Sequence, residues 1–198
     1  MWIKICGMTT SAAVEAALAA RVDAIGFVFA RSVRELALEA AVALARPARG
    51  RVRCVAVTHH PTQARVDEIV RVFVPDLLQS DAEDLAELRL PAALETLPVV
   101  RAGSDLPAHL PGRLLFEGPS SGRGTVSDWS AARVLARRTQ LVLAGGLSAV
   151  NVADAIALVQ PFGVDVSSSV EELPGVKSPA AITRFVAAVR AAPGARGA

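Results

Sequence analysis

The chain has 198 residues, of which 52 % are hydrophobic and 20 % are charged, and its mean hydropathy is +0.41. A chain this apolar can bury a sizeable core and is far from the composition of disordered proteins. The 21 basic and 19 acidic side chains leave a formal charge of +2, which is too small for a protein dedicated to nucleic acids. Aromatic residues make up only 4 %, too few for surfaces that stack on bases.

The N-terminal residues and the cysteines favour a cytoplasmic protein. No apolar run approaches the ~20 residues that span a bilayer, and residues 1–6 lack the features of a signal peptide. Cys6 and Cys54 could form one disulfide, but a cytosolic chain with a large core needs no crosslink, so we expect two free thiols. Neither a membrane nor a nucleic acid is therefore an expected partner.

Short apolar runs of β type alternate with longer segments of helical period along the whole chain. In the first half this pattern predicts strands over 2–6, 24–29, 51–57 and 76–79, and helices over 10–20, 35–45, 62–72 and 82–89. In the second half it predicts strands over 97–101, 113–116, 141–144 and 163–167, and helices over 130–138, 150–159 and 179–192. Between the fifth and sixth strands only a weak turn signal, around 105–110, stands in place of a helix.

Strands that alternate with helices form parallel βαβ units. Eight such units that close on themselves make a (β/α)8 TIM barrel, an α/β fold for which ~200 residues is the lower bound. We therefore predict one compact barrel with short loops over residues 1–192 and a frayed tail over 193–198. An open doubly wound sheet is the alternative, but the glycine fingerprint expected after its first strand is absent.

In such a barrel the reactive groups lie at the carboxyl ends of the strands, which we call the mouth. Two neighbouring strand ends carry small residues ahead of a helix, Gly145-Gly146 after the seventh strand and Ser167-Ser168-Ser169 after the eighth. Backbone N–H groups and a helix dipole can together hold a phosphate there. Alternatively, the glycines only make a tight turn and the serines only cap a loop.

Cys6 ends the first strand with its thiol toward the mouth, and Gly7 lets another group approach the backbone closely. Lys4, on the same face of the strand, offers a cation that would lower the pKa of this thiol from its usual ~8.5. An isolated buried cysteine is, however, more often a small hydrophobe, and we assign Cys54 to that role. Asp128 follows a Gly/Ser-rich stretch that could close over a ligand, or it could cap the next helix.

His59 and His60 follow the third strand. No carboxylate or thiolate stands at metal-site spacing from them along the chain. The sequence therefore predicts a solvated loop here and no metal.

Together these motifs resemble the phosphoribosylanthranilate isomerases, (β/α)8 enzymes of tryptophan biosynthesis. The resemblance covers nearly the whole chain, in the segments KICGMT (4–9), DAIGFVF (23–29), GRGTVSDW (122–129), LAGGL (143–147), GVDVSS (163–168), VE (170–171) and PGVK (174–177). It implies an acid-base Amadori rearrangement of N-(5-phosphoribosyl)anthranilate to 1-(2-carboxyphenylamino)-1-deoxyribulose 5-phosphate, the third step of tryptophan biosynthesis from chorismate. It also implies a small sugar-phosphate substrate, no cofactor, and a monomer or a homodimer.

The reaction needs an acid that opens the ribose ring and a base that removes the C2 proton. By resemblance the base is Cys6, the acid is Asp128, and Arg34 contacts the anthranilate carboxylate. The expected substrate-binding residues are Arg34, Gly7, Gly122, Gly124 and Asp165, and the expected phosphate-binding residues are Gly145, Gly146, Ser167, Ser168 and Ser169.

Asp165 should point into the barrel beside the first strand. We expect it to pair with Lys4, because an unpaired buried charge would be costly, or else to position the acid or the base.

The second, fourth and sixth loops depart from the family. The family's Gln-Leu-His-Gly is reduced to Gln79-Ser80 before Asp81, its Ser-Pro-Arg is Ser32-Val33-Arg34, and Phe116 and Thr125 replace a common aspartate and lysine. Three possibilities therefore stay open: an isomerase with a trimmed pocket, a divergent paralogue that acts on a different phosphoribosyl substrate, and a non-catalytic phosphate-binding barrel.

Overall fold

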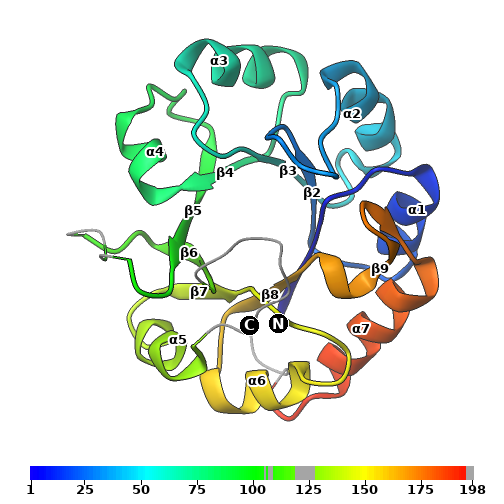
Figure 1. Ribbon diagram of the computed structural model, residues 1–198, viewed down its shortest axis with the longest axis vertical. Coiled ribbons are helices and arrows are strands. Elements are labelled where there is room, and N and C mark those ends of the chain that lie inside the picture. Colours follow the sequence, from blue (N-terminus) through cyan, green and yellow to red (C-terminus); the bar gives the residue numbers. More distant parts are fainter. Residues whose placement is uncertain (105, 107–108, 119–127, 195–198) are drawn as a thin grey trace.

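The computed structural model describes residues 1–104, 106, 109–118 and 128–194 and shows eight parallel strands that close into a barrel, with helices around it (Figure 1). The strands follow one another around the barrel in chain order, and the last pairs with the first. The predicted (β/α)8 TIM barrel is confirmed.

The strands of the barrel are β1 (Trp2–Cys6), β2 (Ala24–Val28), β3 (Arg53–Val57), β4 (Leu77–Asp81), β5 (Glu95–Arg101), β6 (Arg113–Glu117), β7 (Gln140–Leu143) and β8 (Gly163–Val166). The surrounding α-helices are α1 (Ser11–Ala19), α2 (Leu38–Ala45), α3 (Gln63–Val72), α4 (Ala82–Glu87), α5 (Trp129–Ala136), α6 (Val152–Val159) and α7 (Pro179–Ala191). Two short 3-10 helices, η1 (Arg46–Ala48) and η2 (Ser168–Val170), and a hairpin of β9 (Glu171–Leu173) and β10 (Val176–Lys177) complete the described elements.

Every predicted strand and helix is present, with ends that differ by a few residues, whereas the hairpin β9–β10 was not predicted. Between β5 and β6 the described residues contain no helix, and positions 105, 107 and 108 of the expected turn lie outside them. The expected tail is described only for Pro193 and Gly194. No helix among the described residues is long and apolar enough to cross a membrane. Cys6 and Cys54 are both buried free thiols, as expected.

Strand side chains alternate between the barrel interior and the layer beneath the helices. The interior apolar cluster comprises Ala24, Val55, Leu77, Leu97, Val99, Leu115, Val142 and Ala144. The larger cluster packs the outer strand faces against the helices and contains both Phe116 and Cys54. Because the period is two, polar residues at the carboxyl ends of the strands also point inward, and they form the mouth.

Closure of the barrel depends on a close approach between β8 and β1. Gly163 pairs with Trp2, and a Cβ on Gly163 would lie 2.7 Å from the Trp2 carbonyl oxygen. Since that oxygen belongs to a paired strand, Gly163→Ala should lower the free energy of unfolding by about 1–3 kcal/mol, measured by urea denaturation. Gly112→Ala is the matched control, because a Cβ there meets nothing within 4 Å. Equal losses in the two variants would contradict this account of closure.

Candidate active site

Cys6 ends β1 and packs against β2. It pairs in register with Gly26, and a Cβ on Gly26 would lie 3.1 Å from Cys6 Sγ, so only a very small residue leaves room for the thiol. Burial raises the pKa of Cys6 above its ordinary value, while Lys4 and, more weakly, Lys177 lower it in part. The predicted effect of Lys4 is therefore present but smaller than that of desolvation, and the free protein favours the neutral thiol.

Lys4 and Asp165 form a buried ion pair inside the barrel. They are register partners on β1 and β8, Lys4 Nζ lies 2.9 Å from Asp165 Oδ1, and their side chains are 0 % and 9 % exposed. Burial lowers the pKa of Lys4, but the charge and hydrogen bond of Asp165 outweigh it and hold that pKa above its ordinary value. The predicted pairing is confirmed, and it commits one carboxylate oxygen of Asp165 to Lys4.

Gly7 is approached by the side chain of Arg34. Its φ is +82°, in the region that favours glycine, and a Cβ there would lie 2.5 Å from Arg34 Cδ. Arg34 continues to Glu171, where Nε donates to Oε1 at 2.6 Å and Nη2 donates to Oε2 at 2.9 Å. A substrate carboxylate at Arg34 would therefore share the guanidinium with Glu171 or use its other N–H groups.

Lys177 joins this cluster from β10. Its buried Nζ donates to Glu171 Oε1 at 2.7 Å and to the Ser167 carbonyl oxygen and Oγ at 3.0 and 3.1 Å. Ser167 Oγ in turn donates to the Cys6 carbonyl oxygen at 3.1 Å. Sequence reasoning gave Glu171 and Lys177 no role, because only the folded hairpin brings them to the mouth.

The loops after β7 and β8 lie side by side, as predicted. Ser169 Oγ donates to the Leu147 carbonyl oxygen across them, and η2 begins at Ser168. Gly145 and Gly146 have φ of 86° and 64°, so glycine relieves strain at both positions. The two loops bring main-chain groups and serine hydroxyls together at one side of the mouth.

Asp128 caps helix α5. Its Oδ1 accepts hydrogen bonds from the N–H groups of Ser130 and Ala131 at 2.9 and 3.1 Å, and the residue is exposed. Of the two alternatives left open by the sequence, the structure shows the cap. Gly122 and Gly124 lie outside the described residues.

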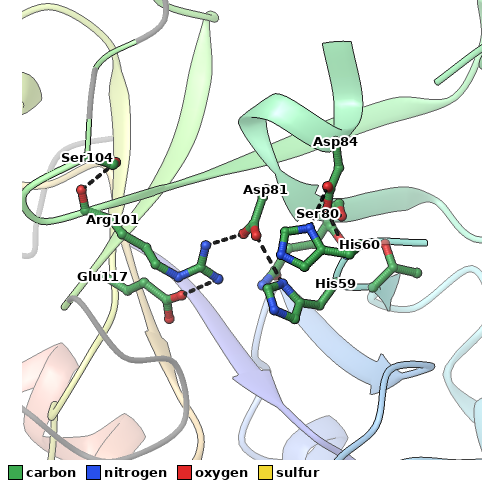
Figure 2. A network of polar contacts seen from close by, with 10 residues as sticks. His59, His60, Ser80, Asp81, Asp84, Arg101, Ser104 and Glu117 are labelled. Carbon is green, nitrogen blue, oxygen red and sulfur yellow. Dashed lines mark hydrogen bonds and ion pairs between the residues drawn. The ribbon is translucent and has the colours of Figure 1, made fainter. Parts of the chain in front are cut away.

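A second polar cluster lies at the ends of β4, β5 and β6 (Figure 2). Arg101 forms ion pairs with Asp81 through Nη1 and with Glu117 through Nη2, the latter at 3.3 Å. These three residues were not predicted as site residues. Each follows an inward-facing residue by two positions, so strand alternation was a signal that could have found them.

The interpretation of His59 and His60 as a solvated loop with no carboxylates at metal-site spacing is wrong. His59 Nδ1 lies 3.0 Å from Asp81 Oδ2, and His60 Nδ1 lies 2.9 Å from Asp84 Oδ1. The carboxylates stand 22 and 24 residues away along the chain, on β4 and the first turn of α4 (Figure 2). Spacing along the chain misses them because neighbouring parallel strands bring their ends together.

Loss of the buried cation should destabilise the fold. Lys4→Met leaves the Asp165 carboxylate buried without its partner and should lower the free energy of unfolding by about 3–5 kcal/mol, measured by urea denaturation. Arg53→Met is the control, because Arg53 and Glu95 form an exposed pair whose loss should cost no more than about 1 kcal/mol. A Lys4→Met variant no less stable than Arg53→Met would show that the buried pair is not required.

Comparison with known proteins gives one consistent match. The model of the family described as N-(5'phosphoribosyl)anthranilate (PRA) isomerase matches residues 3–188. Relatives named N-(5'-phosphoribosyl)anthranilate isomerase, from Mesorhizobium japonicum and Azorhizobium caulinodans, are 40 % and 38 % identical. Their alignments cover 96 % of this chain and 95 % and 92 % of the relatives.

Solved structures agree with the sequence relatives. TrpF from Jonesia denitrificans is 35 % identical with a TM-score of 0.78, covering 96 % of this chain and 97 % of that one. Phosphoribosyl anthranilate isomerase from Thermus thermophilus is 27 % identical with a TM-score of 0.83, covering 96 % and 98 %. The chain belongs to the N-(5'-phosphoribosyl)anthranilate isomerase family, whose enzymes serve tryptophan biosynthesis.

Proposed function

We propose that the mouth of this barrel carries out the Amadori rearrangement of N-(5-phosphoribosyl)anthranilate to 1-(2-carboxyphenylamino)-1-deoxyribulose 5-phosphate. The observation that carries the proposal is the setting of Cys6, a buried thiol at a strand end that two buried lysines, Lys4 and Lys177, stabilise as a thiolate. A phosphoribosyl anthranilate isomerase solved with reduced 1-(o-carboxyphenylamino)-1-deoxyribulose 5-phosphate is 25 % identical to this chain, with a TM-score of 0.77 over 94 % of it, and supports this class of substrate.

Cys6 is the proposed base that removes the C2 proton. It needs its thiolate form, and the cations of Lys4 and Lys177 favour that form against the cost of burial. Substrate carboxylate is proposed to bind Arg34 beside Gly7, and Asp165 to set the position of Lys4 beneath the thiol.

The phosphate is proposed to bind the loops after β7 and β8, at Gly145, Gly146, Ser167, Ser168 and Ser169. Gly122 and Gly124 are proposed to close over the substrate. Gln79 supports a polar ligand on the other side of the mouth, because its buried Oε1 has no hydrogen-bond partner among the described residues. A buried acceptor left unpaired costs about 1–3 kcal/mol, which a donor from the substrate would recover.

Asp128 is the proposed acid that protonates the ribose ring oxygen. A release of its carboxylate from the cap of α5 would accompany this role. Glu117 is a second carboxylate at the mouth, 14 % exposed and paired with Arg101, so the two must be compared directly.

We also propose that the chain acts in the cytoplasm, as a monomer or a homodimer. Its two free thiols suit a reducing compartment.

Growth of a tryptophan auxotroph that lacks this isomerase tests the function. The wild-type chain should restore growth, and Cys6→Ala should lower kcat by about 10²–10⁴-fold and fail to restore it. Cys54→Ala is the matched control, since that buried thiol packs beneath the helices. If the folded wild-type chain fails to rescue, a different phosphoribosyl substrate is favoured, and rescue by Cys6→Ala equal to wild type would remove Cys6 as the base.

The identity of the acid follows from two variants. If Asp128 is the acid, Asp128→Asn should lower kcat by about 10²–10⁴-fold while Glu117→Gln has the smaller effect. Steady-state kinetics with N-(5-phosphoribosyl)anthranilate measure both. The reverse order would move the role to Glu117.

The pH profile tests how Cys6 is activated. Lys177→Met removes a cation that lowers the pKa of Cys6, so the rising limb of kcat/KM should move to higher pH. Lys177→Arg keeps the charge and should leave the limb near its wild-type position. A limb that does not move in Lys177→Met would rule out this electrostatic role.

A further inference from the structure

His59, His60, Asp81 and Asp84 form a compact cluster at the β3–β4 edge of the mouth. One ligand atom from each side chain lies within 4.8 Å of all the others. Figure 2 shows the two imidazoles beside the two carboxylates that descend from β4 and α4. We propose that these four side chains bind a divalent transition-metal cation of the Zn²⁺ type, through two imidazole nitrogens and two carboxylate oxygens.

The distances require only small adjustments. In a tetrahedral site with metal–ligand bonds of ~2.0–2.1 Å, neighbouring ligand atoms lie ~3.3–3.4 Å apart. His59 Nδ1 and Asp81 Oδ2 are 3.0 Å apart, and His60 Nδ1 and Asp84 Oδ1 are 2.9 Å apart. The imidazole rings lie against each other, with centroids 3.9 Å apart. A metal ion would thus take the place of the shared proton in each His–Asp pair.

Each carboxylate has one oxygen held by the protein and the other directed at an imidazole. Asp81 Oδ1 accepts from Arg101, which leaves Oδ2 facing His59. Asp84 Oδ2 accepts from Ser80 Oγ at 2.8 Å and from the His60 N–H at 2.9 Å, which leaves Oδ1 facing the His60 ring. Outer hydrogen bonds of this kind orient the ligands of metal sites and raise their affinity.

The local charge also favours a cation. Asp81 and Asp84 contribute two negative charges, and the cation in contact with them, Arg101, is shared with Glu117. The His59 and His60 side chains are 53 % and 67 % exposed, so an ion can reach the cluster without opening the barrel. The two imidazoles select transition metals over Mg²⁺ or Ca²⁺, which prefer oxygen ligands.

Metal titration of the full-length, tag-free chain tests the proposal, because binding is read without any measurement of isomerase activity. Zn²⁺ alone, followed by calorimetry, should bind at one ion per chain and raise the Tm as its concentration rises. Co²⁺ at the same site should show the visible absorption of a cation with fewer than six ligands.

Variants locate the ion. Asp84→Asn and His60→Asn should each weaken Zn²⁺ affinity by more than about tenfold, and asparagine tolerates the left-handed backbone of His60, with φ +47°. Ser80→Ala removes only an outer hydrogen bond and should weaken affinity by about tenfold. His59→Asn, at a half-exposed side chain, is a second ligand variant should His60→Asn fold poorly. His109→Asn removes the third histidine of the chain and should change nothing.

Two results would overturn the proposal. The first is Zn²⁺ binding to wild type no tighter than to His59→Asn or Asp84→Asn. The second is binding that survives in those variants and disappears in Cys6→Ser, which would place the ion at the thiol.

Discussion

The buried pair of Lys4 and Asp165 lies at the seam where the barrel closes. The two residues are register partners, and the next inward position on each strand carries Cys6 on β1 and Ser167 after β8. Because the side-chain period is two, the register that joins Lys4 to Asp165 also places the thiol beside the loop proposed to bind phosphate. The hydrogen bond from Ser167 Oγ to the Cys6 carbonyl oxygen fastens the same seam one layer higher. Closure of the barrel and assembly of the proposed catalytic centre are thus one structural event.

Charged groups line both sides of the mouth, and their value is geometric more than energetic. Glu171 holds Arg34 and Lys177 on one side, and Arg101 holds Asp81 and Glu117 on the other. Ion pairs taken out of water repay little of their desolvation cost, so they add less stability than apolar residues of similar size would. They do fix the direction of each side chain, which a polar substrate requires.

The sequence predicted what depends on local period and missed what depends on contacts across strands. Apolar alternation located β1 to β8 and their helices, and the pairing of Lys4 with Asp165 followed from the neighbouring positions of β1 and β8. The hairpin β9–β10 was not predicted because its strands are short and lack an apolar period. The carboxylates beside His59 and His60 were missed because they come from a different strand. Asp128 carried two signals at once, and no pattern in one sequence separates a cap from an acid.

The shortness of the chain decides where specificity resides. α4 begins at Ala82, directly after β4 ends at Asp81, so this side of the mouth has no loop that could fold over a ligand. The groups available there are side chains of the strand ends themselves, held in position by the barrel, among them Gln79 with its unpaired oxygen. Sites on strands are more rigid than sites on loops, so a ligand must match them as they stand. In this barrel, selectivity on the β3–β6 side therefore follows from which polar residues end the strands.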